Sequence, residues 1–126
     1  MSIFQKTFRY IRKKKYNAYI HYKVILINSM MKKEEDFALW NQFLEGDEKA
    51  YLYIYKLYAQ DMYSYGMLFT TNSELVKDCL HDVFIKIHRN RKKLSQVDNI
   101  RLYLLKAMKN YLFDVFDKKK ELFHND

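Results

Sequence analysis

The fold of this chain is decided by one stretch in its second half, ELVKDCLHDVFIKIH, which spans residues 74–88. Its apolar residues recur three and four positions apart, as on one face of an α-helix, and polar residues fill the positions between them. The stretch therefore predicts an amphipathic helix with one buried stripe. That stripe holds Leu75, Val76, Cys79, Leu80, Val83, Phe84 and Ile87.

Two helices with the same spacing are predicted before this central one. Asp36 can cap a short helix that Gly46 ends, because a carboxylate accepts from free backbone N–H groups and glycine tolerates positive φ angles. Asp47 can cap the next helix, which runs to about Phe69. Their apolar faces hold Phe37, Trp40, Phe43 and Leu44, then Tyr51, Ile54, Tyr55, Tyr58, Met62, Tyr65 and Phe69.

Start signals also precede the central helix and a fourth one. Thr71 and Glu74 have the separation of a capping box, which predicts the start of the central helix. Residues 90–97 are polar and aperiodic, and we predict a loop there. Asp98 or Asn99 then caps the fourth helix. Its inward residues are Ile100, Tyr103, Leu104, Ala107, Met108, Tyr111, Leu112, Val115 and Phe116.

The composition favours an all-helical fold. The chain has 126 residues, 49% of them apolar and 17% aromatic, which suffices for one core in one domain. It has no proline and only two glycines, whereas a sandwich, a barrel or a doubly wound sheet needs many tight turns. We therefore predict an all-α protein, a compact bundle of about four helices with a basic N-terminal extension.

The same counts exclude several classes of protein. Cys79 is the only cysteine, so no disulfide can form within the chain, and no secretory signal peptide is visible. The apolar run at 24–27 is far shorter than the roughly 20 residues that cross a bilayer. Two isolated glycines cannot build a glycine-rich phosphate loop. A cytoplasmic location is the expectation.

The net charge of +8 is unevenly distributed. Residues 1–33 hold nine Lys or Arg and no acid, and residues 34–85 hold three bases against ten acids. Residues 86–120 return to eleven bases against three acids. The body of the protein thus has an acidic front half and a basic rear half. Such a molecule can face a basic partner with one end and a polyanion with the other.

The first 30 residues give conflicting patterns. The segment 4–11 has apolar residues at helical spacing, whereas the segment 20–26 alternates as a strand does. Because the two periods conflict, the sequence assigns neither helix nor strand to this basic, aromatic extension. Met30 and Met31 stand just before the regular part, so a start of translation there and an extension that does not pack are both open.

Catalytic chemistry has little support in the sequence. Asp78, His81 and Asp82 share one helix face, where two carboxylates and an imidazole could hold a divalent metal. No second cluster of ligands completes a shell, and no nucleophile or pocket marks His81 as a general base. We predict that the chain is not an enzyme and uses no cofactor, metal or small-molecule substrate. The twelve tyrosines and Trp40 are interpreted as packing residues rather than as ligand contacts.

Basic residues of the rear half are predicted to form one surface. The loop carries Arg91, Lys92 and Lys93, and a solvent-facing flank of the fourth helix carries Arg101, Lys106, Lys109 and Asn110. A solvated face without function is the plain alternative. Because loop and helix are adjacent, however, their charges combine. Phosphate contacts need such a positive surface, and reading of bases needs polar groups such as Asn90 and Asn99 beside it.

The order and spacing of these motifs resemble region 2 of the extracytoplasmic-function (ECF) sigma factors, small initiation factors of bacterial RNA polymerase. The resemblance is carried by AYLYIYKLY at 50–58, ELVKDCLHDVFIK at 74–86 and NIRLYLLKAMKNYLFD at 99–114. It covers roughly residues 36–120, and each short motif is weak without the others.

The resemblance implies two binding surfaces. In the family, the helix that matches 74–88 docks on the coiled coil of the polymerase beta-prime subunit. The loop and the fourth helix open the minus-ten promoter element and bind its non-template strand. The positions that match the polymerase-binding surface are Asp78, His81, Asp82 and Ile85. Those that match the DNA-binding surface are Asn90, Arg91, Lys92, Lys93, Ser95, Gln96, Asn99, Arg101, Lys106, Lys109 and Asn110.

The resemblance therefore implies core RNA polymerase and promoter DNA as partners, and it leaves an anti-sigma factor open as a third. His81 stands where the family usually has glutamine, and His88 where it often has tryptophan. We expect an extension over 1–30, a region 2-like domain over 31–121 and a tail over 122–126. Region 4 of the family has no counterpart in this chain, so a truncated gene, a fragment and a factor that uses region 2 alone are all open.

Two further hypotheses assign the protein to other functional classes. The cationic first 30 residues could bind a membrane surface or polyanions in general. Alternatively, the chain is a sigma-like relic that folds but binds nothing. Deletion of residues 1–30 separates the first of these from the sigma-like function, because polymerase binding survives the deletion only under the latter.

Overall fold

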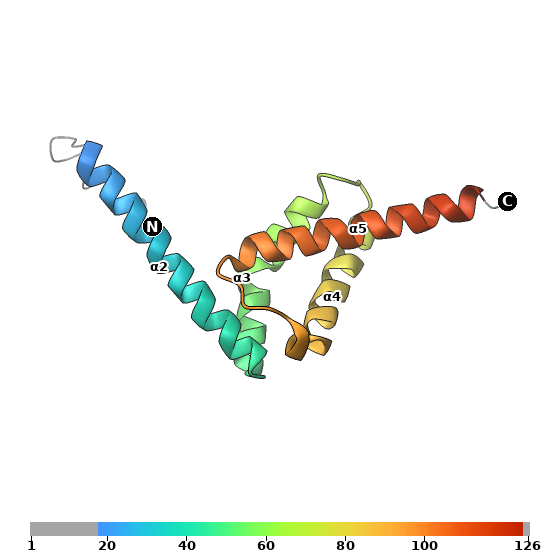
Figure 1. Ribbon diagram of the computed structural model, residues 1–126. Coiled ribbons are helices and arrows are strands. Elements are labelled where there is room, and N and C mark those ends of the chain that lie inside the picture. Colours follow the sequence, from blue (N-terminus) through green and yellow to red (C-terminus); the bar gives the residue numbers. More distant parts are fainter. Residues whose placement is uncertain (1–17, 125–126) are drawn as a thin grey trace. The chain divides into compact units, whose positions relative to one another are not determined.

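The computed structural model describes residues 18–124 and contains no strand among them. Its four α-helices are α2 (Ala18–Leu44), α3 (Glu48–Gly66), α4 (Ser73–Arg89) and α5 (Ile100–His124). A single turn of 3-10 helix, η1 (Arg91–Lys93), lies between α4 and α5 (Figure 1). The predicted all-α bundle is confirmed. The N-terminal extension was expected over 1–30. Its residues 18–30, which include the segment 20–26 with the alternation of a strand, are helical and belong to α2. Residues 1–17 lie outside the described part of the chain.

The chain divides into two compact units between Glu35 and Asp36. This boundary falls within α2, so the last turns of α2 belong to the second unit with α3, α4 and α5. In the second unit, each of α3, α4 and α5 packs against the other two (Figure 1). The loop after α4 returns along the bundle to the start of α5, as the orange segment of Figure 1 shows.

The core of the second unit follows the predicted apolar stripes. Tyr51 is only partly buried, and its hydroxyl donates to the carbonyl of Phe84 at 3.0 Å, as expected for a core tyrosine with its hydroxyl at the rim. Phe37, predicted to face inward, is instead 41% exposed. The buried apolar side chains are Trp40, Phe43, Ala50, Ile54, Tyr58, Met62, Val76, Cys79, Leu80, Val83, Phe84, Ile87, Ile100, Leu104, Met108 and Leu112.

The helix starts confirm some predicted caps and correct others. The Asp47 carboxylate accepts from the backbone N–H of Lys49 and begins α3, and the Asn99 side chain accepts from Leu102 N–H at 3.0 Å and begins α5. The predicted capping box at Thr71 is wrong. Asn72 is the N-cap of α4 instead, because its amide oxygen reaches the N–H of Leu75 and satisfies the first turn one residue later.

Two predicted helix ends are placed differently. Gly46 has φ +100° in the turn after α2, as predicted for a residue that ends a helix. The helix predicted to reach Phe69, however, ends at Gly66. At Gly66 a Cβ atom would lie 2.7 Å from Cγ1 of Val76 and 3.0 Å from Cε of Met108. The lack of a side chain therefore lets α3 approach both α4 and α5.

The short helix predicted to start at Asp36 is wrong. Asp36 lies inside α2, which begins at Ala18, because the segment 30–35 is built of Met, Lys and Glu, all good helix formers, and continues the helix without a break. The carboxylate has a different role. It is buried, with 6% of the residue exposed, and its Oδ2 accepts from the backbone N–H of Ile100 at 3.1 Å.

Asp36 also accepts from the Tyr58 hydroxyl at 3.3 Å through Oδ1. One carboxylate of α2 thus joins the first turn of α5 to the middle of α3. Burial, and then the negative charge of Asp36, raises the pKa of Tyr58 to about 12. The carboxylate also sits at the positive end of the α5 dipole.

Replacement of Asp36 by Ala should lower the free energy of unfolding by about 2 kcal/mol or more, because it leaves a buried N–H and a buried hydroxyl without an acceptor. The measurement is urea unfolding followed by circular dichroism. The control is Glu35→Ala at the neighbouring exposed position, expected to change stability by about 0.5 kcal/mol at most. Equal losses in the two variants would contradict this role of Asp36.

Candidate functional site

The four residues predicted to bind polymerase lie together on the outer face of α4. Asp78, His81, Asp82 and Ile85 are all exposed, because their spacing of three and four residues places them opposite the buried stripe of the helix. Ile85 is 51% exposed, which is unusual for an isoleucine in a helix with so clear a buried face. The face therefore offers two carboxylates and an apolar contact to a partner.

Two members of this face are held by tyrosines of neighbouring helices. The Tyr111 hydroxyl of α5 donates to Oδ2 of Asp82 at 2.7 Å. The Tyr55 hydroxyl of α3 lies 3.3 Å from Nε2 of His81. The hydrogen bond from α5 thus orients the carboxylate of Asp82. Chiefly through this hydrogen bond, the pKa of Tyr111 is raised to about 12.

Removal of the Asp82 carboxylate should return the pKa of Tyr111 toward its ordinary value near 10, because the protonated phenol loses its charged acceptor. In the unchanged protein, Tyr111 keeps its proton until close to pH 12. The measurement is an NMR titration of the tyrosine Cζ signals in Asp82→Ala, with Tyr111→Phe to assign the signal. The matched control, Asp78→Ala on the same face, should leave the titration unchanged.

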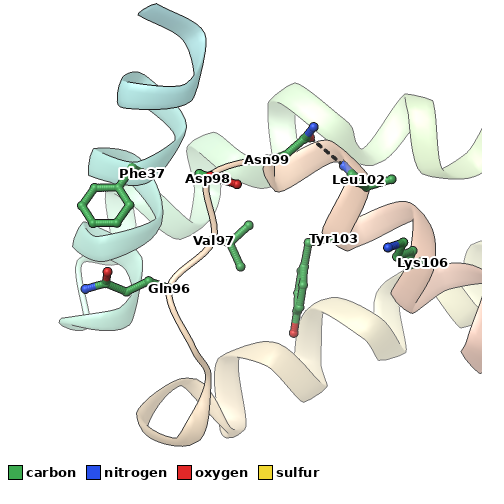
Figure 2. Close-up of a pocket in the computed structure, with 8 residues that line it drawn as sticks. All are labelled: Phe37, Gln96, Val97, Asp98, Asn99, Leu102, Tyr103 and Lys106. Carbon is green, nitrogen blue, oxygen red and sulfur yellow. Dashed lines mark hydrogen bonds between the residues drawn. The ribbon is translucent and has the colours of Figure 1, made fainter. Parts of the chain in front are cut away.

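The loop between α4 and α5 lines an open, shallow cavity of about 400 Å³. Figure 2 shows Phe37 projecting from α2 on one side, the loop residues in the middle, and the first turns of α5 on the other. Apolar side chains and polar groups alternate around the wall. The lining residues are Phe37, Gln96, Val97, Asp98, Asn99, Leu102, Tyr103 and Lys106.

This loop is fastened at both ends. The indole N–H of Trp40 donates to the carbonyl of Ser95 at 2.9 Å, and the ring of Tyr103 meets the Trp40 ring edge-on at 5.0 Å between centroids. At the other end, the side chain of Asn99 caps α5 (Figure 2). The shape of the cavity therefore depends on the same buried tryptophan that anchors α2 in the core.

The predicted cations of the loop have different surroundings. Lys92 and Lys93 are exposed and have no side-chain partner among the described residues. The Arg91 side chain is half-buried. It donates to the carbonyl of His88 at 3.4 Å and lies beside Gly46 in the turn after α2. Arg91 is thus engaged in packing, whereas the two lysines are available to a ligand.

The basic and polar residues predicted to share one flank of α5 do not share it. Arg101 and Asn110 are nine positions apart and therefore lie about 180° apart around the helix. Arg101 turns toward α3 and pairs with Asp61 at 3.3 Å. Lys106 lines the loop cavity, and Nζ of Lys109 lies 5.6 Å from the ring centroid of Phe113. The predicted single basic flank is wrong because these four residues are spread over about half of the circumference of the helix.

The remaining predicted DNA-binding residues divide between two hollows. Gln96 and Asn99 line the loop cavity, whereas Asn90 and Asn110 line a second cavity between α4, the loop and α5. Ser95 is exposed, contributes its carbonyl to Trp40 and does not line either cavity.

The sequence did not indicate the apolar walls of the loop cavity. Phe37 and Leu102, which are 41% and 48% exposed, come from elements far apart in the chain. Phe37 belonged to a predicted buried face, and Tyr103 was expected to be core. One signal in the sequence could have indicated these wall residues. On a helical wheel, an apolar residue at the edge of a buried stripe lies beside the polar face, where it is partly exposed.

Neither a metal cluster nor a membrane span is found in the described part of the chain. No group of three or more His, Cys, Asp or Glu side chains within residues 18–124 could hold a metal ion. No helix there is both long and apolar enough to cross a bilayer. Nε2 of His88 lies 2.9 Å from a carboxylate oxygen of Glu48.

Comparison of the chain with protein-family models, with curated proteins and with solved structures finds no significant match.

Proposed function

We propose that this protein is a sigma factor-like transcription initiation protein, which binds core RNA polymerase through α4 and the non-template strand of the minus-ten promoter element through the loop before α5. It performs no covalent chemistry. The observation that carries the proposal is the loop cavity. Gln96 and Asn99, which both belong to the predicted DNA-binding residues, line this cavity together with aromatic and aliphatic side chains.

The cavity has the chemistry that an unstacked base needs. A base that leaves its stack loses contacts with its neighbours, and apolar or aromatic walls replace them. Phe37, Val97 and Tyr103 supply such walls. The amide group of Gln96 can both donate and accept at a base edge. Since Asn99 uses its oxygen to cap α5, its amide N–H₂ group remains for a ligand.

The backbone of the strand requires positive charge near the cavity. Lys92 and Lys93 precede the cavity-lining residues by a few positions, are exposed and have no partner among the described residues. Lys106 lines the cavity itself. Phosphate contacts by such lysines contribute affinity without sequence preference, and this affinity falls as salt rises.

The face of α4 has the chemistry of a docking surface for a basic partner. Two exposed carboxylates one turn apart steer a positively charged surface, and the exposed Ile85 offers apolar area one turn further along the helix. The hydrogen bond from Tyr111 holds Asp82 in one orientation, which lowers the entropy lost on binding. These properties support the beta-prime coiled coil as the partner of α4.

Two kinds of loop variant should differ in their dependence on sequence. Gln96→Ala and Asn99→Ser should alter base preference at one position of single-stranded promoter DNA, because each removes an amide from the cavity. Serine retains the cap of α5. Lys92→Ala and Lys93→Ala should weaken binding to every sequence and reduce the salt slope by about 0.7 per lysine.

Fluorescence anisotropy with single-base variants of one oligonucleotide measures both effects. The arginine that packs inside the bundle offers a contrast, since Arg91→Lys should change stability more than the salt slope. If the amide and the lysine variants lost affinity equally for every sequence, the loop would contribute only charge. That result would contradict its role in reading a base.

Reversal of charge on α4 should abolish docking. The double variant Asp78→Lys, Asp82→Lys should lose binding to purified core polymerase in a pull-down, while its helical circular dichroism stays unchanged because both side chains are exposed. The matched control is Glu45→Lys, Asp117→Lys, which makes the same change of net charge at exposed positions away from this face. Retained binding by the first variant would refute the docking assignment.

A further inference from the structure

The part of α2 that belongs to the first unit carries a row of exposed apolar side chains. Ile20, Val24, Ile27 and Met31 recur four, three and four positions apart, so they lie within about 60° of one another around the helix. The two isoleucines and Met31 are each slightly more than half exposed, and Val24 is half-buried. Soluble monomers rarely leave such a contiguous group of large apolar side chains uncovered, and its presence is typical of an interaction site.

Two further residues widen this row. Leu26 and Met30, which are 43% and 57% exposed, extend it to about 160° of the helix circumference. We call these six residues the apolar face of α2. Its width is that of the buried side of a helix rather than of a side that faces water. Ile25 is also exposed but lies on the opposite side of the helix, about 160° from Ile27.

Positive charge accompanies the apolar face of α2. Residues 1–33 hold nine Lys or Arg and no acid. Of these, Lys23, Lys32 and Lys33 are exposed on the helix. Lys23 lies within the apolar face, where its four-carbon stem can follow apolar surface while the ammonium group reaches polar surroundings. The face therefore suits a partner that is apolar inside and negatively charged at its border.

Two other classes of partner fit these features less well. A nucleic acid would engage the lysines, but phosphate contacts make no use of a wide aliphatic face. A second copy of the helix could align its own apolar face, yet the row covers only about two heptads, whereas a coiled coil needs about three or four. Two copies would also bring the same positive charges together. A lipid surface with anionic headgroups uses both the apolar face and the lysines.

We propose that the apolar face of α2 inserts into the surface of a membrane that contains anionic phospholipids and holds the protein there. The helix lies parallel to the membrane plane, with its apolar side chains about 5–10 Å deep, at the boundary between headgroups and acyl chains. The lysines contact the lipid phosphates. This inference does not rest on the proposed function, because α4 and the loop belong to the other unit.

Co-sedimentation of the full chain with lipid vesicles tests the requirement for charge. One set of vesicles is phosphatidylcholine alone, and the other has equal parts of phosphatidylcholine and phosphatidylglycerol. We expect at least about tenfold tighter binding to the mixed vesicles, since each lysine near an anionic surface contributes about fivefold in affinity. The double variant Lys32→Gln, Lys33→Gln should weaken binding to the mixed vesicles by about tenfold or more and leave binding to the neutral ones unchanged.

Two isoleucines of the same helix provide a matched comparison for the apolar face. Ile27→Gln removes an aliphatic side chain from this face, whereas Ile25→Gln makes the same change on the opposite side. Glutamine is a good helix former, so both variants keep the helix, which circular dichroism checks. Ile27→Gln should bind the mixed vesicles about tenfold more weakly, the effect of one isoleucine left out of the apolar layer. Ile25→Gln should bind as the unchanged protein does.

Three results would overturn the proposal. Equal binding by the two isoleucine variants would show that charge alone attracts the vesicles, as for any polyanion. A dimer that forms without lipid in size-exclusion chromatography and is disrupted by Ile27→Gln would assign the apolar face to a second copy of the chain. Equal or absent binding to the two kinds of vesicle would exclude the anionic lipid surface. None of these results bears on binding to core polymerase or to DNA, so the proposed function is tested separately.

Discussion

The buried carboxylate of Asp36 is the interaction on which the rest of the second unit depends. It accepts at once from the first N–H of α5 and from a tyrosine of α3, so it fixes where α5 begins relative to the other helices. The loop cavity lies directly before that helix start, and Phe37 is the next residue after Asp36. If Asp36 lost its bond to α5, the start of α5 would no longer be fixed relative to α2. Phe37 would then no longer be held opposite the amide groups of Gln96 and Asn99 across the cavity.

Local signals predicted much of the fold. The apolar faces of α3, α4 and α5 were predicted correctly, because residues three and four positions apart lie on the same side of a helix and are buried together. Asp47 and Asn99 were correct caps because each acts on its own next turn. Asp36 was misassigned because its partner, Ile100, lies 64 positions away. A side chain that can cap the following residues can equally cap a distant helix, and nothing local distinguishes the two.

The candidate site was predictable to a smaller extent. The four residues on α4 could be grouped from the sequence since they belong to one helix and their relative positions follow from its pitch. The loop and α5 residues could not, because their grouping depends on how three elements enclose a space. Thus Arg101 is paired with α3, Arg91 packs beside a turn, and the asparagines divide between two hollows. Tyr103, expected only to fill the core, stands between the two hollows as a common wall.

Gly66 has a consequence for how this chain can vary in evolution. A single methyl group there would lie 2.7 Å from Cγ1 of Val76, so a side chain at this position requires Val76 on α4 to shift or change, whereas the terminal methyl of Met108 can move aside. Helix propensity alone would favour alanine at such a place. Any chain that keeps this three-helix contact should therefore keep glycine at the corresponding site, ten residues before a small branched residue on the next helix. This pair would serve as a landmark for aligning distant relatives whose surface residues have diverged beyond recognition.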